Sequence, residues 1–210
     1  MSDDFGVPEP EHLTSIGGAE DAIAESSVRL ALPAEADAIG QIQVAAWRRA
    51  YEGLLPAQVL ADLDPAQFSA QWRAALLMPG EARNRVMVAL AGRTLVGFAA
   101  ITASDDPDAD PRHDALIAEL AVDPEATRAG HGSRLLNAVV DTVRADGFSR
   151  VTVWVNATDD VLRSFYTESG WAPDGAHREL DLHGDGSVRV KQLRLHTDPS
   201  ERTELDLMQA

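Results

Sequence analysis

The sequence predicts an α/β (α+β) domain in which helices flank a mixed central sheet of about seven strands. Three observations support this class. Short apolar runs alternate with segments of helical periodicity along most of the chain. Within residues 116–136, a strand pattern changes directly into a helix pattern across two glycines. The 210 residues suit one domain with extensions. We expect an acidic N-terminal tail (1–25), a domain (26–197) and a polar C-terminal tail (198–210).

The elements follow from periodicity and from turn residues. Strands are expected over 28–32, 85–90, 95–103, 116–122, 150–155, 178–182 and 188–195. Helices are expected from Pro33 to a cap at Gly53, from Pro56 onward, from Asp64 through Leu76, along the apolar face Leu135–Val143, and from Thr158 to Ser169.

The junction at 116–136 is suited to binding an anion. Leu116–Val122 reads as a strand that ends at Pro124, and Gly130 and Gly132 lead into a helix. The first amides of a helix lack intrahelical partners, and the helix dipole adds partial positive charge there. Glycine lets the backbone approach a phosphate closely. A Rossmann fingerprint is excluded because Leu135 occupies the place of its third glycine, and no P-loop sequence is present.

Composition excludes several function classes. The chain has no cysteine, which removes disulfides, thiolate metal sites and a cysteine nucleophile. A net charge of −16 argues against nucleic acid and anionic membranes as partners, and it would favour a cationic substrate, although acidic surfaces usually serve solubility. The sequence shows no apolar run of membrane-spanning length and no signal peptide, so we expect a cytoplasmic protein.

The acidic loop 104–114 carries Asp106, Asp108 and Asp110 at every second position. A calcium loop of the EF-hand type is rejected, because Pro111 replaces the turn glycine and Ile117 stands where a bidentate glutamate is needed. The sequence leaves two interpretations, a solvated hairpin loop or a surface that attracts a cationic substrate. We expect no metal.

The glycine turn resembles the acetyl-CoA loop of the GNAT N-acetyltransferase superfamily, Arg/Gln-x-x-Gly-x-Gly/Ala after a strand that ends in Val-x-Pro. Here the strand ends in Val122-Asp123-Pro124, and Thr127 stands at the usual Arg or Gln position, with Arg128 one place later. Residues 155–171 are similar to the family's closing motif, through Phe165-Tyr166 and Gly170-Trp171. The motif's customary Asn is Asp159 here, with Asn156 nearby. The order of elements over residues 26–197 also agrees with this family.

The resemblance implies a sheet that splays in the middle, between the strands ending at Val122 and near Val155, and a cosubstrate, acetyl-CoA. The pantetheine arm would enter the splay and contact the backbone of Leu120, Ala121 and Val122, with Asn156 and Asp159 on the opposite side. The pyrophosphate would lie on the turn, with Arg128 and Arg134 as either additional cations or solvated residues of the helix start. His131 would be either a phosphate contact or a spacer. The turn residues are Thr127, Arg128, Ala129, Gly130, His131, Gly132 and Ser133.

The resemblance also implies a reaction, acetyl transfer to a primary amine of a small molecule or a protein. Tyr166 matches the family's general acid, which protonates the departing CoA sulfur. Glu119 is the candidate base, directly or through water; the alternative is a carboxylate that faces solvent or pairs with an arginine. An amide near Leu120 or Ala121 would bind the thioester oxygen. Without a cysteine, direct attack in a ternary complex is expected.

Two further questions stay open in the sequence. Trp47 and Tyr51 lie one helical turn apart, so both are either substrate contacts in a cleft or core aromatics. The departures at Thr127 and Asp159 leave a non-catalytic acyl-CoA-binding sensor or interaction module as the alternative function, and a purely structural domain as a third. The family resemblance also leaves a homodimer open.

Overall fold

The computed structural model describes residues 26–182, 186 and 188–200, which form one seven-stranded sheet in the order β1-β2-β3-β4-β5-β7-β6. All neighbouring strands are antiparallel except β4 and β5. The expected seven-stranded mixed sheet is confirmed. The strands are β1 Ser26–Leu30, β2 Arg85–Ala91, β3 Thr94–Ala103, β4 Asp114–Val122, β5 Arg150–Asn156, β6 Ala172–Asp181 and β7 Arg189–Thr197.

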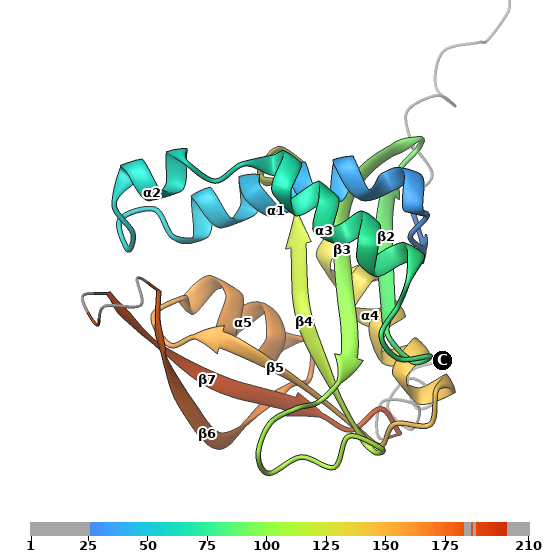
Figure 1. Ribbon diagram of the computed structural model, residues 1–210. Coiled ribbons are helices and arrows are strands. Elements are labelled where there is room, and N and C mark those ends of the chain that lie inside the picture. The colour runs from blue at the N-terminus through green and yellow to red at the C-terminus, as the bar shows by residue number, and fades with distance from the viewer. Residues whose placement is uncertain (1–25, 183–185, 187, 201–210) are drawn as a thin grey trace, which may run out of the picture.

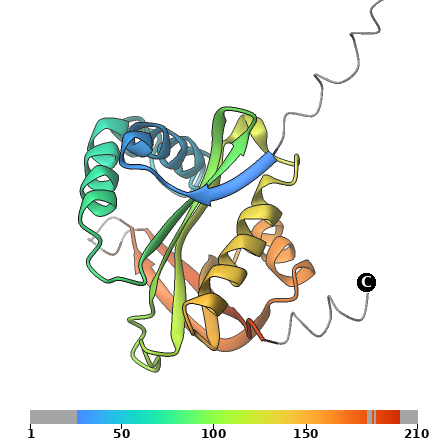
Figure 2. The ribbon, with the colours of Figure 1, turned by 90° about the vertical axis from the view of Figure 1, so that its right-hand side faces the viewer.

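The helices cover both faces of this sheet, as Figure 2 shows in side view. α1 (Ala36–Ala50) and α3 (Pro65–Leu77) pack on one face, where Ile39 and Ile42 meet Val88 and Phe98. α4 (His131–Ala145) and α5 (Asp160–Glu168) pack on the other face. The short α2 (Ala57–Ala61) follows Pro56, where a helix was expected, and brings the described part to five α-helices.

Several element bounds differ from the sequence prediction. The first strand is Ser26–Leu30 instead of 28–32, and a 3-10 turn at Pro33–Glu35 precedes α1. The sixth strand begins at Ala172 rather than at residue 178, because a register shift after Pro173 hides its alternation. The N-terminal tail, most of the tail after residue 197, and residues 183–185 of the last turn lie outside the described residues.

The central strands part halfway along their length (Figure 1). β4 and β5 pair only from Asp114 with Arg150 to Ile117 with Val153. Beyond Val153, β5 continues to pair with β7 as far as Asn156, while β4 continues to pair with β3 as far as Val122. The expected splay is therefore present, and one edge of β4 is unpaired from Ala118 onward.

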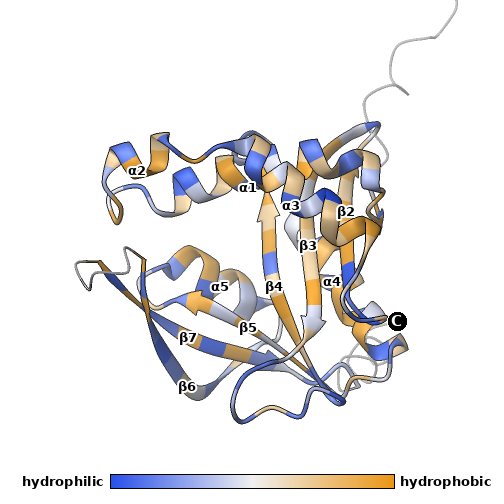
Figure 3. Cartoon of the chain, viewed as in Figure 1, coloured by the Kyte–Doolittle hydropathy of each residue, from blue (hydrophilic) through white to orange (hydrophobic). Residues whose placement is uncertain are grey.

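A β-bulge lies where the strands part. Ile101 pairs with Ile117 and Ala100 with Glu119, so Ala118 is an extra residue in β4. One extra residue exchanges the faces on which later side chains lie. Ala115 and Ile117 belong to the core beneath α4, whereas Ala121 belongs to the core beneath α1 and α3. Glu119, two residues before Ala121, consequently faces α1. In Figure 3, β2, β3 and β4 are mostly apolar in colour, and β6 is largely hydrophilic.

Candidate active site

A cavity of about 510 Å³ opens where β4 and β5 part. Its wall combines α1 and α2 on one side with β5, α5 and the β6–β7 pair on the other. The volume lies in the range of small-molecule sites. Its polar lining consists of Trp47, Tyr51, Glu119, Asn156, Asp159, Tyr166, Arg178 and Gln192.

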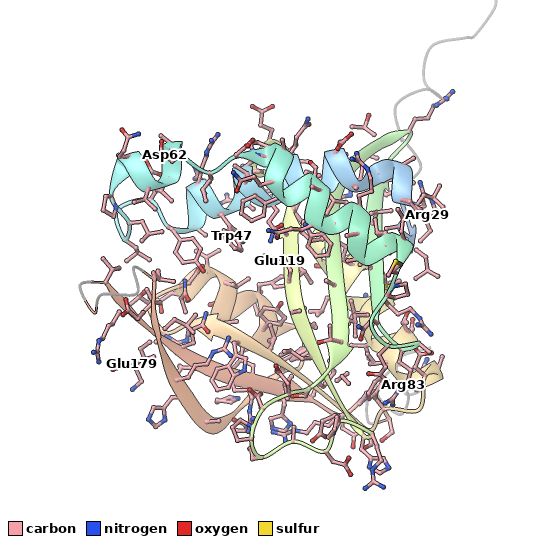
Figure 4. All side chains as sticks on the ribbon, viewed as in Figure 1. Arg29, Trp47, Asp62, Arg83, Glu119 and Glu179 are labelled. Carbon is pink, nitrogen blue, oxygen red and sulfur yellow. The ribbon has the colours of Figure 1, made fainter. Side chains whose placement is uncertain are left out.

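Glu119 projects from β4 toward α1, and Trp47 lies beside it in Figure 4. The Trp47 indole Nε1 donates to the Glu119 carboxylate at 3.3 Å, and Gln43 Nε2 donates at 3.3 Å. Burial raises the pKa of Glu119, and the hydrogen bonds from Trp47 and Gln43 limit that rise by stabilising the ionised form. The carboxylate is partly buried and lines the cavity, and no arginine among the described residues forms an ion pair with it, so the pairing with an arginine is the part of the alternative that is wrong.

Gln43 is a site residue that sequence reasoning missed. It lies four residues before Trp47 on α1, and residues four apart share a helix face. Its amide donates to Glu119, and its Oε1 accepts from Trp72 Nε1 at 2.6 Å. Its position four residues before Trp47 was the sequence feature that could have identified it.

Tyr166 lies on the opposite side of the same cavity, on α5. Its side chain is 1% exposed and packs edge-on against Phe165 and Trp171, with ring centroids 5.2 and 5.3 Å away. Burial raises the pKa of Tyr166 far above its usual range, and the nearby charge of Glu119 adds to this effect. The hydroxyl therefore keeps its proton at neutral pH.

Tyr51 and Trp47 both line the cavity, with ring centroids 6.1 Å apart. Burial raises the pKa of Tyr51, and the charge of Glu119 raises it further. A hydrogen bond with Asn156 and the charge of Arg178 act in the opposite direction. Asn156 in turn accepts from Gln192 Nε2 at 3.1 Å. The two aromatic residues are thus connected to the polar groups of the cavity rather than to the apolar core.

The glycine turn lies at the N-terminus of α4. Gly130 caps the helix with φ +79° and Arg128 has φ +63°, both in the left-handed region. Thr127, Arg128, Ala129 and Gly130 are exposed. The first backbone hydrogen bond of the helix runs from the Arg134 amide to the Gly130 carbonyl at 3.1 Å, so the amides of residues 131–133 precede the intrahelical ladder.

Three side chains that were predicted to contact the cofactor are buried or bonded within the protein itself. The His131 side chain is 5% exposed, and its Nδ1 has no hydrogen-bond partner among the described residues, so only its backbone faces the turn. Arg134 Nη1 donates to the Ala129 carbonyl at 3.0 Å. Asp159 caps α5 by accepting from the Leu162 amide at 2.9 Å, while it also lines the cavity.

The acidic loop is not simply solvated, as one interpretation assumed. Arg194 on β7 is 3% exposed and forms ion pairs with Asp106, Asp108 and Asp174. The Trp154 Nε1 also donates to Asp106 at 3.1 Å. Because two of the loop's aspartates are already paired with Arg194, the loop offers a cationic ligand less negative charge than its sequence suggests.

Two negative findings concern the described residues. None of their helices has the length and apolarity that a bilayer crossing requires. Their His, Asp and Glu side chains form no cluster of three or more that could hold a metal ion.

Comparison with known proteins agrees with this geometry. Residues 44–171, more than half of the chain, match the acetyltransferase (GNAT) family. A mycothiol acetyltransferase of Rhodococcus erythropolis is 38% identical over 100 residues, which are 48% of this chain and only 29% of that protein.

Solved structures show the same fold at low sequence identity. PaiA N-acetyltransferase of Thermoplasma acidophilum, in complex with coenzyme A, has a TM-score of 0.62 at 16% identity, covering 83% of this chain and 99% of that one. YncA of Salmonella typhimurium, a putative acetyltransferase with acetyl-CoA, has a TM-score of 0.60 at 15% identity, covering 83% and 94%. From the family match and the shared fold we conclude that the chain belongs to the GNAT family of acetyltransferases.

Proposed function

We propose that the protein transfers an acetyl group from acetyl-CoA to a primary amine, by direct attack in a ternary complex. The observation that carries this proposal is the unpaired edge of β4 beyond Ile117. It borders a cavity that holds a partly buried carboxylate, Glu119, and a buried phenol, Tyr166. The relatives solved with coenzyme A or acetyl-CoA support the choice of cosubstrate.

The backbone of β4 fits an extended pantetheine arm. The Asp123 amide donates to Val96 of β3 at 2.8 Å. Because backbone groups alternate along a strand, the groups of Ala121 also point to β3, while those of Leu120 and Val122 point into the opening. Leu120 and Val122 are therefore the residues that would pair with the amide groups of the arm.

The turn before α4 fits the diphosphate. Residues Thr127 to Gly130 are exposed, and the amides of residues 131–133 have no role in the helix ladder. These donors converge at the positive end of the α4 dipole. Side chains contribute less, because His131 is buried and Arg134 is bonded to Ala129.

Acetyl-CoA supplies a thioester, which is an acetyl group activated toward amines. The protein must provide two proton transfers. Glu119, whose pKa is raised by burial, is a better proton acceptor than an exposed glutamate and would take the proton from the attacking amine. Tyr166 keeps its proton and would give it to the departing sulfur. The Leu120 amide, which points into the opening, is positioned to bind the carbonyl oxygen.

The test is thiol release from acetyl-CoA in the presence of a panel of primary amines. Because the chain has no cysteine, a thiol reagent detects only the CoA product. We expect release that depends on the amine and on Tyr166. Binding of acetyl-CoA without release on any amine would favour the non-catalytic sensor instead. A homodimer and a cytoplasmic location remain predictions from the sequence.

A further inference from the structure

Arg178 is a cation of the cavity wall that the reaction proposed above does not use. It lies on β6, and its guanidinium stacks on the Trp154 ring, with Cζ 4.4 Å from the ring centroid. Its Nε donates to Gln192 Oε1 at 2.8 Å. Stacking and one hydrogen bond fix the plane of the guanidinium. Neither Nη atom forms a hydrogen bond or ion pair with a described residue, so the two terminal nitrogens are available to a ligand.

The second arginine at Trp154 shows the contrast. Arg194 also lies over that ring, with Cζ 5.5 Å from the centroid, but its three nitrogens are bonded to Asp106, Asp108 and Asp174. Asp106 and Asp105 are near enough for their charges to act on Arg178, yet neither forms an ion pair with it. The local carboxylates therefore satisfy Arg194 and leave Arg178 without an anionic partner.

Tyr51 shows how the charges of the cavity are arranged. The negative charge of Glu119 raises the pKa of the Tyr51 hydroxyl, and the positive charge of Arg178 lowers it. Glu119 lies on the β4 side of the cavity and Arg178 on the β6 side, with Tyr51 within electrostatic reach of both. A molecule that fills the space beside Tyr51 therefore meets a proton acceptor at one end and a planar cation at the other.

We propose that the acceptor is an amine that also carries a carboxylate, which pairs with Nη1 and Nη2 of Arg178 while the amine lies toward Glu119. The guanidinium presents two parallel donors that match a carboxylate. This inference rests on the proposed acetyl transfer and narrows its acceptor to aminocarboxylates. It differs from the cationic acceptor that the net charge of the chain alone would favour.

The experiment compares matched pairs of acceptors that differ only at the acid group. Suitable pairs are 3-aminopropanoate with its carboxamide and 5-aminopentanoate with its carboxamide. Paired, charge-assisted hydrogen bonds to an exposed guanidinium that Trp154 and Gln192 hold in place predict that kcat/KM is roughly 10-fold higher for the preferred acid than for its amide. Because acid and amide also differ in amine basicity, the quantity of interest is the change in this ratio between wild type and variants.

Three variants separate binding from structure. Arg178→Gln should reduce the acid-to-amide ratio to near one by lowering kcat/KM for the acid, with the amide little affected. Arg178→Lys should give an intermediate ratio, because it keeps the charge and loses the paired donors. Arg189→Gln is the matched control. Arg189 lies on the same β6–β7 pair, in an exposed ion pair with Glu179, and its replacement should leave the ratio unchanged.

A wild-type protein that treats acid and amide alike, or a ratio that survives Arg178→Gln, would overturn the inference. Failure of the proposed function is recognised separately. If no amine is acetylated, calorimetric titration of the same acids into the CoA-saturated protein decides the question. Binding of the acid that needs Arg178 supports the carboxylate site, and no binding refutes it.

Discussion

Glu119 is an ionisable group in an environment that opposes its charge, and that environment suits a base. Burial raises its pKa, while donors from Trp47 and Gln43 keep the ionised form accessible. An active base must be ionised, so kcat/KM should fall as the pH decreases through the raised pKa of Glu119. The ordinary pKa of glutamate is about 4.3, and this acid limb should lie at a higher pH than that.

Glu119→Gln should abolish the acid limb and lower kcat/KM by roughly 10²- to 10⁴-fold. A pH–rate profile measured with saturating acetyl-CoA checks this. The thermal unfolding temperature at pH 7 is the control, and it should stay level or rise because a buried charge is removed. A variant that is folded and retains the wild-type acid limb would show that another group is the base.

Tyr166→Phe removes one hydroxyl from a side chain that is already packed between Phe165 and Trp171. If the phenol protonates the departing sulfur, kcat should fall by roughly 100-fold or more, while the dissociation constant of acetyl-CoA changes little. Steady-state kinetics and calorimetry measure the two quantities. In the wild type, the raised pKa of Tyr166 should also prevent a loss of turnover as the pH approaches 10, where an ordinary tyrosine loses its proton. Unchanged turnover in Tyr166→Phe would remove this role.

The residues of the site were predictable from the sequence to different degrees. Glu119, Tyr166, Trp47 and Tyr51 could be named because they lie at fixed spacings from motifs or from each other. Arg178 and Gln192 could not, because they meet only through the register of β6 against β7. That register depends on a shift after Pro173 that no local pattern indicates.

At the level of single elements, α4 has a glycine with positive φ at each end, and the two form a matched pair. Gly130, at the N-terminus of α4, has φ +79°, and Gly147, just beyond its C-terminus, has φ +82°. An alanine at either position would adopt an unfavourable left-handed conformation, at a cost of roughly 1–2 kcal/mol. The two substitutions should therefore lower stability similarly.

Their effects on ligand binding should differ. Gly130→Ala adds a Cβ at the turn proposed to hold the diphosphate, where it would also approach Arg134 Nη1 at 3.1 Å. We expect it to weaken acetyl-CoA binding by about tenfold or more, with Gly147→Ala unchanged. Calorimetric dissociation constants compare the two variants. Equal affinities would show that the diphosphate does not lie on this turn.

The bulge at Ala118 is an element that the sequence did not reveal. Residues 116–122 read as an ordinary apolar strand, and alternation alone does not show that Glu119 changes face. The structure shows it through pairing with β3, since Ile101 and Ala100 are consecutive while their partners Ile117 and Glu119 are not. Long-range pairing therefore decides where the candidate base points.

On the scale of the whole molecule, Arg194 joins the acidic loop and β6 to β7. Removing one partner of a buried ion pair is strongly destabilising, by about 3–5 kcal/mol. Arg194→Ala should thus lower the melting temperature by roughly 10 °C in a domain of this size. Arg189→Ala, which removes an exposed pair, should lower it by only a few degrees at most. Melting curves at pH 7 check both, and equal effects would contradict a structural role for the Arg194 cluster.

The pH dependence of this cluster has a defined sign. The hydrogen bond from Arg194 lowers the pKa of Asp108 to about 2, and the pKa of Asp174 is also lowered, since contacts with Ala176 and Arg194 outweigh its burial. Groups with lowered pKa values stabilise the fold above the unfolded value, near 3.8, and lose that contribution as the pH falls below it.

The overall fold was predictable because its evidence is local. Strand and helix periodicity, the Val-x-Pro strand end and the Phe-Tyr helix each lie within one continuous segment. The pairing of Arg194 with the acidic loop joins residues 86 and 88 positions apart, and it changed the interpretation of that loop. Contacts of this range depend on how β7 lies against the rest of the sheet, which periodicity does not encode.

The most direct test of the account is hydrogen exchange of the backbone amides with and without coenzyme A, followed by mass spectrometry of overlapping peptides. The account predicts that the ligand slows exchange in two segments, 118–122 on the open edge of β4 and 128–133 at the turn into α4, and leaves β2 unchanged. Slowed exchange elsewhere, with neither of these segments affected, would contradict it.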